Sequence, residues 1–173
     1  MKSAIVHHTV SANNYSADEA PGIVLGICRF HRNGNGWSDM GYNFLVDRFG
    51  KTYVGRAGGP SKAVVGAQAQ GYNAQTTGAS SIGTHTKHPI TEKAMDAFVR
   101  LLSWKLALHG TRATGKTKLV SAGGSLNRYP SGKRIHVRRI SGHGRFDKTE
   151  CPGRALKHQL EEMRKRTQSR IKR

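Results

Sequence analysis

The apolar residues of this chain fall in short segments whose spacing alternates along the sequence between that of a strand and that of a helix. Residues 4–8 form a short apolar run that ends in two histidines, and Tyr42, Phe44 and Val46 occupy alternate positions, as is typical of strands. A turn at residues 48–51 predicts a hairpin. The predicted strands are residues 4–8, 42–46, 52–54 and 80–83.

Helical spacing separates these strands. The clearest helix begins at Thr91, a residue type that caps helix N-termini, and Ile90 and Met95 are placed for a hydrophobic staple. Gly110 stops it. Its apolar stripe is predicted to be Ala94, Phe98, Leu101, Leu102 and Leu108. Two further helices are predicted, at residues 16–30 and from Pro152 onward.

Strands interleaved with helices predict an α/β fold, in which a mixed β-sheet is flanked by helices on both faces. A chain of 173 residues suits one domain, so we expect residues 1–173 to form a single domain. Residues 57–78 read mostly as loop, and the basic, Gly/Ser-rich residues 111–139 as a long loop that frames a site. The last helix is expected to end in a basic tail at residues 164–173.

Net charge is the most extreme global property of the chain. It has 29 Lys and Arg against 10 Asp and Glu, which gives 29 − 10 = +19. Such a field favours polyanions: nucleic acid, acidic lipid surfaces or the anionic polymers of a bacterial wall. Charge alone does not choose among them. No apolar run approaches the ~18 residues that a membrane span needs.

Two cysteines cannot make a disulfide framework, and their surroundings differ. Cys28 lies in a helical pattern and reads as a small apolar residue. Cys151 follows His143 by eight residues and is expected at a helix N-terminus, where the dipole lowers the pKa of a thiol. Zinc prefers His nitrogen and Cys sulfur, and a catalytic site keeps three protein ligands and one open position. These residue types therefore indicate a metal site.

Histidines supply the other candidate ligands. Neighbouring strand residues point to opposite faces, so only one of His7 and His8 enters such a site. His143 lies between two glycines that allow a close approach to another group. His85 and His88 read as an accidental pair.

A series of short motifs follows in order from about residue 4 to residue 160: His7-His8-Thr9, residues 37–46, Gly55-Arg56, residues 65–68, Asn73, Gly142-His143 and residues 149–153. Together they resemble the N-acetylmuramoyl-L-alanine amidase family, which includes phage lysozyme-type amidases and animal peptidoglycan recognition proteins. Residues 37–46 and 149–153 are each fairly specific, and their joint occurrence is strong evidence. The chain looks most similar to secreted actinobacterial amidases or a related phage lysin.

The resemblance implies a site. The zinc ligands of the family fall on His7, His143 and Cys151, so one Zn²⁺ per chain is expected. The family's active-site tyrosine falls on Tyr42, and Thr149 occupies the position where active members have Lys or Thr. The residues that line the family's muropeptide groove fall on His31, Trp37, Gln68 and Asn73.

The activity implied is cleavage of the amide bond between N-acetylmuramic acid and the first L-alanine of the peptidoglycan stem peptide. Zinc would lower the pKa of a water from about 15.7 to about 7 and polarise the amide carbonyl. Thr149 would donate to the developing oxyanion, and Tyr42 would orient the water or pass its proton. Two positions depart from the family: Gln68, often His, and Gly144-Arg145, usually Arg-Asp. Asp147 is expected to replace that missing carboxylate.

Two alternatives stay open. The first is a recognition module that binds peptidoglycan without cutting it. Non-hydrolysing members of the family typically lack the cysteine ligand, so Cys151 favours an enzyme. The second is a nucleic-acid binder, but few aromatic residues lie within 111–139 and 164–173, so only salt-sensitive, non-specific binding is expected.

The expected partners are therefore peptidoglycan and anionic wall polymers, and the chain is expected to be a monomer. Its expected location is extracellular, at the cell wall. The first residues read as a strand and not as a signal peptide, so a processed or trimmed form, or a phage lysin exported by another route, is expected.

Overall fold

A computed structural model describes residues 1–172 of the chain. Within them a five-stranded mixed sheet has the order β3-β2-β4-β1-β7. The strands are β1 Ser3–His8, β2 Phe44–Val46, β3 Thr52–Val54, β4 Thr76–Ser81 and β7 Ile140–Gly142. β1 runs parallel to both β4 and β7, β2 runs parallel to β4, and β3 pairs antiparallel with β2. The parallel strands therefore end at the same edge of the sheet.

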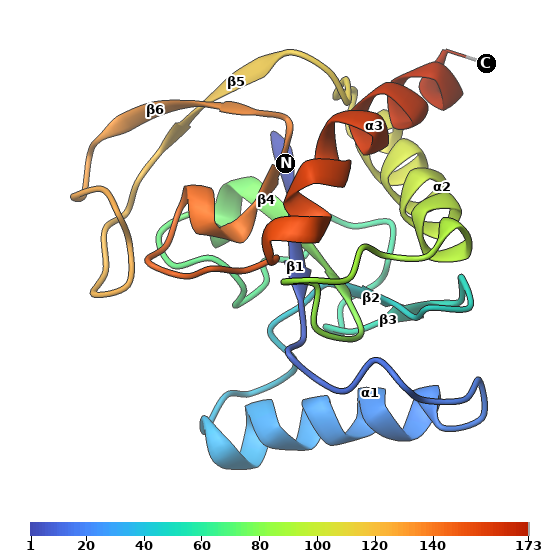
Figure 1. Cartoon of the computed structure of the whole chain (residues 1–173). Helices are drawn as coiled ribbons and strands as arrows, with labels where there is room; N and C mark the ends of the chain where they lie inside the picture. The colour runs from blue at the N-terminus through green and yellow to red at the C-terminus, as the bar shows by residue number, and fades with distance from the viewer. Residues whose placement is uncertain (173) are drawn as a thin grey trace.

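Two helices cover one face of the sheet (Figure 1). α2 (Glu92–Leu108) and α3 (Arg154–Ile171) pack against each other and over the strands. The core between them includes Ala4, Val6, Phe44, Val46 and Ala79, which alternate along their strands. Burying such side chains contributes roughly 25 cal/mol for each Å² of apolar surface removed from water. This core fixes the strands whose ends carry the site.

A third helix packs against the opposite side of the sheet, near the carboxyl ends of the strands. α1 (Ala20–Arg29), which continues as the π-helix η1 (Phe30–Gly34), lies beyond the carboxyl ends of β1 and β4 (Figure 1). Its apolar side packs with Leu45 and Ile82, and Cys28 is half-buried in that cluster. The predicted mixed α/β fold with helices on both faces is confirmed.

Helix α2 begins where its sequence predicts. Thr91 has extended backbone angles, and its hydroxyl accepts a hydrogen bond from the Ala94 amide. Gly110 follows the helix with φ +61°. Four of the five residues predicted for the apolar stripe are buried. The prediction was wrong for the fifth, Leu108, which is 49% exposed. Leu108 lies six residues after Leu102, and at ~100° per residue it turns away from the core.

Two predicted loops contain strands. The segment 57–78 includes the first half of β4, whose residues Thr76 to Ala79 are small or polar yet fully buried. The segment 111–139 is not one long loop, because β5 (Lys116–Val120) and β6 (Arg134–Arg138) pair antiparallel within it. Residues 134–138 alternate polar and apolar side chains, a strand pattern that the prediction passed over in favour of the segment's basic, Gly/Ser-rich composition. The inner face buries Leu119, Ile135 and Val137 against Tyr72 and Phe146.

Helix α3 begins two residues later than predicted, at Arg154. Gly153 precedes it with φ +87°, and the peptide bond between Cys151 and Pro152 is cis. The helix runs to Ile171, so most of the basic segment 164–173 is helical, and residue 173 lies outside the described residues. Over residues 1–172, the helices are too short or too polar for any to cross a lipid bilayer.

Candidate metal centre

Three side chains meet at the carboxyl ends of β1 and β7. His7 is the next-to-last residue of β1, His143 follows β7 directly, and Cys151 lies in the loop before α3. The parallel pairing of β1 and β7 brings their ends together, and the 3-10 turn η3 (His143–Arg145) leads toward the cysteine. One ligand atom from each of the three residues lies within 4.8 Å of the others.

The donors fit Zn²⁺ in number, kind and spacing. The His7 Nδ1 lies 3.7 Å from the Cys151 Sγ, and a tetrahedral zinc ion holds a nitrogen and a sulfur ligand about 3.6 Å apart. The rings of His7 and His143 have centroids 4.5 Å apart. Two nitrogens and one sulfur leave a fourth position for water or substrate, as in catalytic zinc sites.

Gln68 holds the His7 ring from behind. The His7 Nε2 lies 2.6 Å from the Gln68 Oε1, an acceptor, so this nitrogen carries the proton and Nδ1 faces Cys151. The Gln68 Nε2 donates to the Thr76 Oγ1 at 2.9 Å. A Cβ at Gly78 would lie 2.4 Å from the Gln68 Cγ, so a glycine is required there. Gln68 is only 6% exposed.

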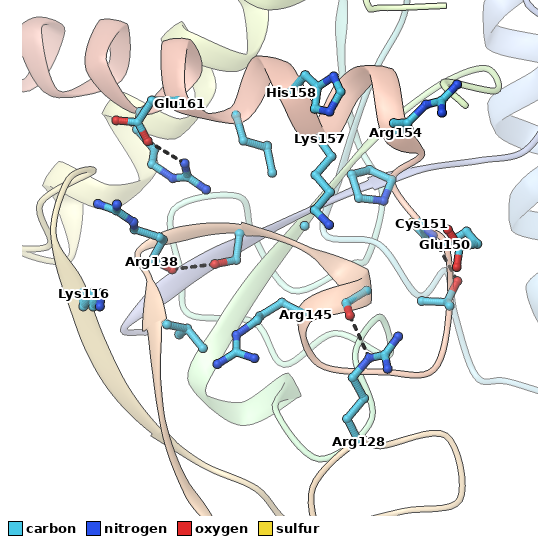
Figure 2. A pocket seen from close by; sticks show the side chains of 18 of the residues that line it. Lys116, Arg128, Arg138, Arg145, Glu150, Cys151, Arg154, Lys157, His158 and Glu161 are labelled. Atoms are coloured by element: carbon cyan, nitrogen blue, oxygen red, sulfur yellow. Dashed lines mark hydrogen bonds and ion pairs between the residues drawn. The ribbon is translucent and has the colours of Figure 1, made fainter. Parts of the chain in front are cut away.

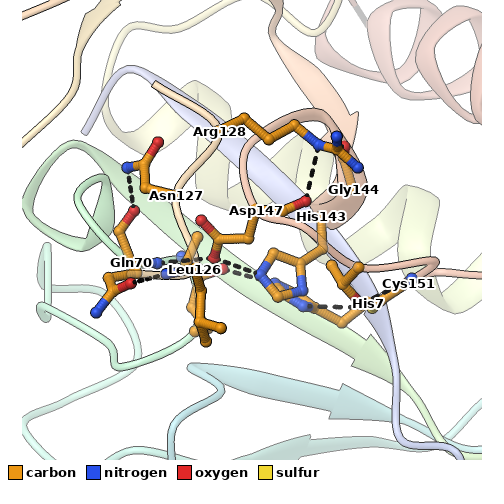
Figure 3. A network of polar contacts seen from close by, with 12 residues as sticks. His7, Gln70, Leu126, Asn127, Arg128, His143, Gly144, Asp147 and Cys151 are labelled. Atoms are coloured by element: carbon orange, nitrogen blue, oxygen red, sulfur yellow. Dashed lines mark hydrogen bonds and ion pairs between the residues drawn. The ribbon is translucent and has the colours of Figure 1, made fainter. Parts of the chain in front are cut away.

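Asp147 does the same for His143. Its Oδ2 lies 2.8 Å from the His143 Nε2 and also accepts the amide of Gln70 at 2.9 Å (Figure 3). Arg128 fastens the turn, since its Nε donates to the carbonyls of Gly144 and Asp147. The structure thus places the Asp147 carboxylate on the His143 ring, and its role in supporting a bound metal stays a prediction. Such partners fix the tautomer and the orientation of a ligand histidine.

Burial sets the protonation of these groups. It lowers the pKa of His7 well below 6.5, and the neighbouring His143 lowers it further, so His7 is neutral and offers a lone pair. Burial raises the pKa of the Cys151 thiol to about 12. The expectation that a helix N-terminus lowers this pKa was wrong, because α3 begins only at Arg154 and the thiol is desolvated.

His8 and His85 belong to the framework. His8 points away from His7, and its Nδ1 accepts the His85 amide at 3.1 Å. The His85 ring lies 2.8 Å from the Ser81 Oγ and 3.0 Å from the His88 carbonyl. Burial lowers the pKa of His8 to about 4. Both rings therefore serve packing and hydrogen bonding.

An aromatic wall leads from His7 to the surface. The Tyr42 ring lies 5.2 Å from the His7 ring and 5.4 Å from that of His31, between centroids. His31 comes from η1, accepts the Gly41 amide at Nδ1, and lies 5.0 Å from Trp37. Trp37 is 39% exposed. The pKa of the Tyr42 hydroxyl is raised to about 12, chiefly by burial and to a smaller extent by the nearby Cys151. The hydroxyl therefore keeps its proton.

Thr149 and Asn73 both make backbone contacts. The Thr149 Oγ1 accepts the Cys151 amide at 3.2 Å, which leaves its own proton free to donate. The Asn73 Oδ1 accepts the amides of Gln68 and Ala69. Contact of Asn73 or Gln68 with a substrate stays a prediction, as does the catalytic role of Thr149.

Sequence reasoning missed the contact between Gln68 and His7. It placed Gln68 in the groove by analogy, because the family position often carries histidine. The pairing depends on the loop before β4 folding back across β1, and that arrangement leaves no local pattern. A usable signal was the residue type itself, since glutamine retains a hydrogen-bonding group at this position.

Comparisons with known proteins agree with this geometry. A family model described as N-acetylmuramoyl-L-alanine amidase matches residues 1–154. The chain is similar to peptidoglycan-recognition protein SC2 of Drosophila melanogaster, with 30% identity over 152 residues, or 87% of this chain and 67% of that protein.

Two solved structures extend the likeness to the fold. Peptidoglycan recognition protein LE in complex with tracheal cytotoxin, a monomeric diaminopimelic acid-type peptidoglycan, gives a TM-score of 0.70 at 25% identity, covering 93% of this chain and 79% of that one. The amidase LysC from Clostridium intestinale gives 0.66 at 23% identity, covering 94% and 80%, a likeness of fold.

Proposed function

The chain belongs to the N-acetylmuramoyl-L-alanine amidase family, and on that premise we propose that it hydrolyses peptidoglycan between N-acetylmuramic acid and the L-alanine of the stem peptide. The observation that carries the proposal is the cluster of His7, His143 and Cys151, with its ligand atoms within 4.8 Å of one another. His7, His143 and Cys151 would hold one Zn²⁺, which would supply a Lewis acid and lower the pKa of water toward neutral pH.

The surrounding residues prepare the site for that ion. Gln68 and Asp147 hold the Nε2 atoms of the two histidines, which directs both Nδ1 atoms toward the centre. Because these orientations are set by internal hydrogen bonds, little rearrangement is needed when the metal binds.

Two hydroxyl groups are placed to stabilise the reaction. Tyr42 keeps its proton at neutral pH and lies beside His7, where it would orient the attacking water or pass a proton. Thr149 lies two residues before Cys151 and has a free proton to donate to the oxyanion that develops on the scissile carbonyl. Trp37 and His31 form an aromatic face against which the muropeptide packs.

A recognition module without activity is the alternative function, since the family's relatives include recognition proteins. The cysteine ligand favours hydrolysis. The decisive test incubates the protein with purified peptidoglycan and measures new alanine N-termini by mass spectrometry. Release of stem peptides that begin with L-alanine, abolished by chelation and restored by zinc, supports the amidase. Binding to the wall without release, in protein loaded with zinc, would show a recognition module.

The same proposal covers the place of action. A substrate in the cell wall requires the chain to act outside the cytoplasm, with peptidoglycan as its partner. We expect the chain to act as a monomer. The relative that binds tracheal cytotoxin supports a muropeptide as the ligand. The formal charge of +19 adds attraction to anionic wall polymers.

A further inference from the structure

A large cavity opens on the outer side of the loop that carries Cys151. Its volume is about 1110 Å³, and it lies between the β5–β6 hairpin and the first turns of α3, with β7 at its base (Figure 2). Thr149 and Cys151 line it, whereas His7, His143 and Tyr42 are not among its lining residues. The cavity therefore adjoins the candidate metal centre and shares with it the loop that carries Thr149 and Cys151.

The lining of this cavity is strongly basic. It contains seven cationic residues against two carboxylates, Glu150 and Glu161. Three of the cations have partners within the fold: Arg128 with two carbonyls, Arg145 with the Tyr129 hydroxyl, and Arg164 with Glu161 and the Ile140 carbonyl.

The other four cations are without a side-chain hydrogen bond or ion pair within residues 1–172. They are Lys116, Arg138, Arg154 and Lys157. Lys116 and Arg138 come from the hairpin and the other two from α3, so they border the cavity from two sides, with Lys157 extending into it (Figure 2).

The start of α3 adds a separate argument. A helix N-terminus carries partial positive charge and favours acidic residues in its first turn, yet this one begins with Arg154 and has Lys157 three positions later. These cations therefore oppose the helix dipole. An anion bound in the cavity would offset that repulsion as well as the mutual repulsion of the unpaired side chains.

The lining also limits the kind of anion. Nucleic-acid strands are held by aromatic residues on which bases stack. Among the residues that line this cavity, Tyr129 is the single Phe, Tyr or Trp side chain. Its ring already lies 5.6 Å from the Arg145 guanidinium. Cationic groups placed on two sides of the cavity match repeated charges on a flexible chain without bases.

We propose that this cavity binds a linear polyol-phosphate polymer of the cell wall, beside the site where peptidoglycan is cut. This inference rests on the proposed function only in placing the protein at the cell wall. The binding of the polymer by the cavity does not depend on it. The phosphodiester groups would pair with the four unpartnered cations, and the polymer would keep the enzyme near its insoluble substrate.

The test compares two triple variants with equal loss of charge. The cavity variant is Arg138→Gln, Arg154→Gln and Lys157→Gln. The control variant changes three exposed cations elsewhere, Lys87→Gln, Lys93→Gln and Arg112→Gln. Each lowers the formal charge from +19 to 19 − 3 = +16. Circular dichroism verifies that both are folded, and binding of poly(glycerol phosphate) is measured from low to high salt.

We expect the cavity variant to bind poly(glycerol phosphate) at least about 10-fold more weakly at low salt, with its slope of log K against log salt reduced by about 2. The control should change less than about 2-fold. Equal losses in both variants, or no loss in either, would overturn the proposal. The proposal would also be overturned if single-stranded DNA of equal charge bound as tightly as the polymer and through the same three residues. The partner would then be nucleic acid.

Turnover of a small soluble muropeptide separates this proposal from the proposed function. The cavity variant should cleave it at the wild-type rate. If the wild type itself does not cleave the muropeptide but binds the polymer through these residues, the amidase proposal fails and the polymer site stands.

Discussion

The metal centre and the basic cavity share one loop and are built differently. At the centre, His7 and His143 are each held by an internal hydrogen bond of 2.6 or 2.8 Å. Around the cavity, Arg138 and Lys157 are exposed and lack such partners within residues 1–172. A metal site needs ligand positions fixed to fractions of an ångström, whereas attraction between a charged surface and a polymer acts over ~8 Å at physiological salt.

This difference predicts how each region responds to substitution. Changes at the centre should be large, specific to the residue and nearly independent of salt. Changes at the cavity or along α3 should be smaller and should vanish as salt screens the charges.

The largest effect is expected for Cys151→Ser. A serine hydroxyl is a poor zinc ligand, so stoichiometric zinc should be lost and amidase activity should fall by at least about 1,000-fold. Zinc content by elemental analysis and stem-peptide release measure both. Cys28→Ser is the matched control and should keep its metal, because Cys28 packs with apolar residues beside α1. Stoichiometric zinc in Cys151→Ser would show that the cluster is not the metal site.

Removing one hydroxyl at the centre should affect turnover alone. Tyr42→Phe and Thr149→Ala should each lower kcat by about 100- to 1,000-fold, as for the loss of one transition-state donor. Zinc content should stay at the wild-type level. Thr149→Ser keeps the hydroxyl and its hydrogen bond to the Cys151 amide, so it should recover most of the rate. Wild-type rates for both Tyr42→Phe and Thr149→Ala would make these residues structural.

The partners of the ligand histidines should affect metal affinity. Asp147→Asn and Gln68→Met should weaken zinc binding by about 10- to 100-fold, measured by competition with a chelator. Asp47→Asn is a suitable control, since Asp47 is equally buried but bonds to Lys51 and Tyr53 and not to a ligand histidine. If Gln68→Met had normal zinc affinity but a raised KM for muropeptide, Gln68 would instead be a substrate-binding residue of the groove, as the family resemblance implies.

The same contrast explains what the sequence could predict. Patterns within a few residues were sufficient for β1, for the capped helix α2 and for the opposite directions of His7 and His8. The spatial grouping of His7, His143 and Cys151 came from the family resemblance and agrees with the parallel pairing of β1 and β7.

Other features were missed. The β5–β6 hairpin was read as loop because the prediction followed the basic, Gly/Ser-rich composition of residues 111–139. The alternation of apolar and polar residues at 134–138 is a strand signal, and burial against Tyr72 and Phe146 explains it. The pKa of Cys151 was misjudged for a different reason, because desolvation depends on the neighbours that fold over the thiol.

The smallest effect is expected at the end of α3, and it tests whether position or mere charge attracts the wall. Lys165→Gln, Arg170→Gln and Lys172→Gln remove the same three charges as the cavity variant, but from the exposed surface of a helix end. Arg166 is left unchanged because it bridges Glu92, Asp96 and Glu162 and so ties α3 to α2.

Charges on a convex surface contact a flexible polymer only in passing, so this variant should lose less than about 3-fold in sedimentation with purified walls at low salt, and nothing at high salt. Hydrolysis of a soluble muropeptide should not change. If this helix-end variant lost as much wall binding as the cavity variant, net charge alone would account for attraction to the wall. The distinction between a shaped cavity and a basic surface would then no longer hold.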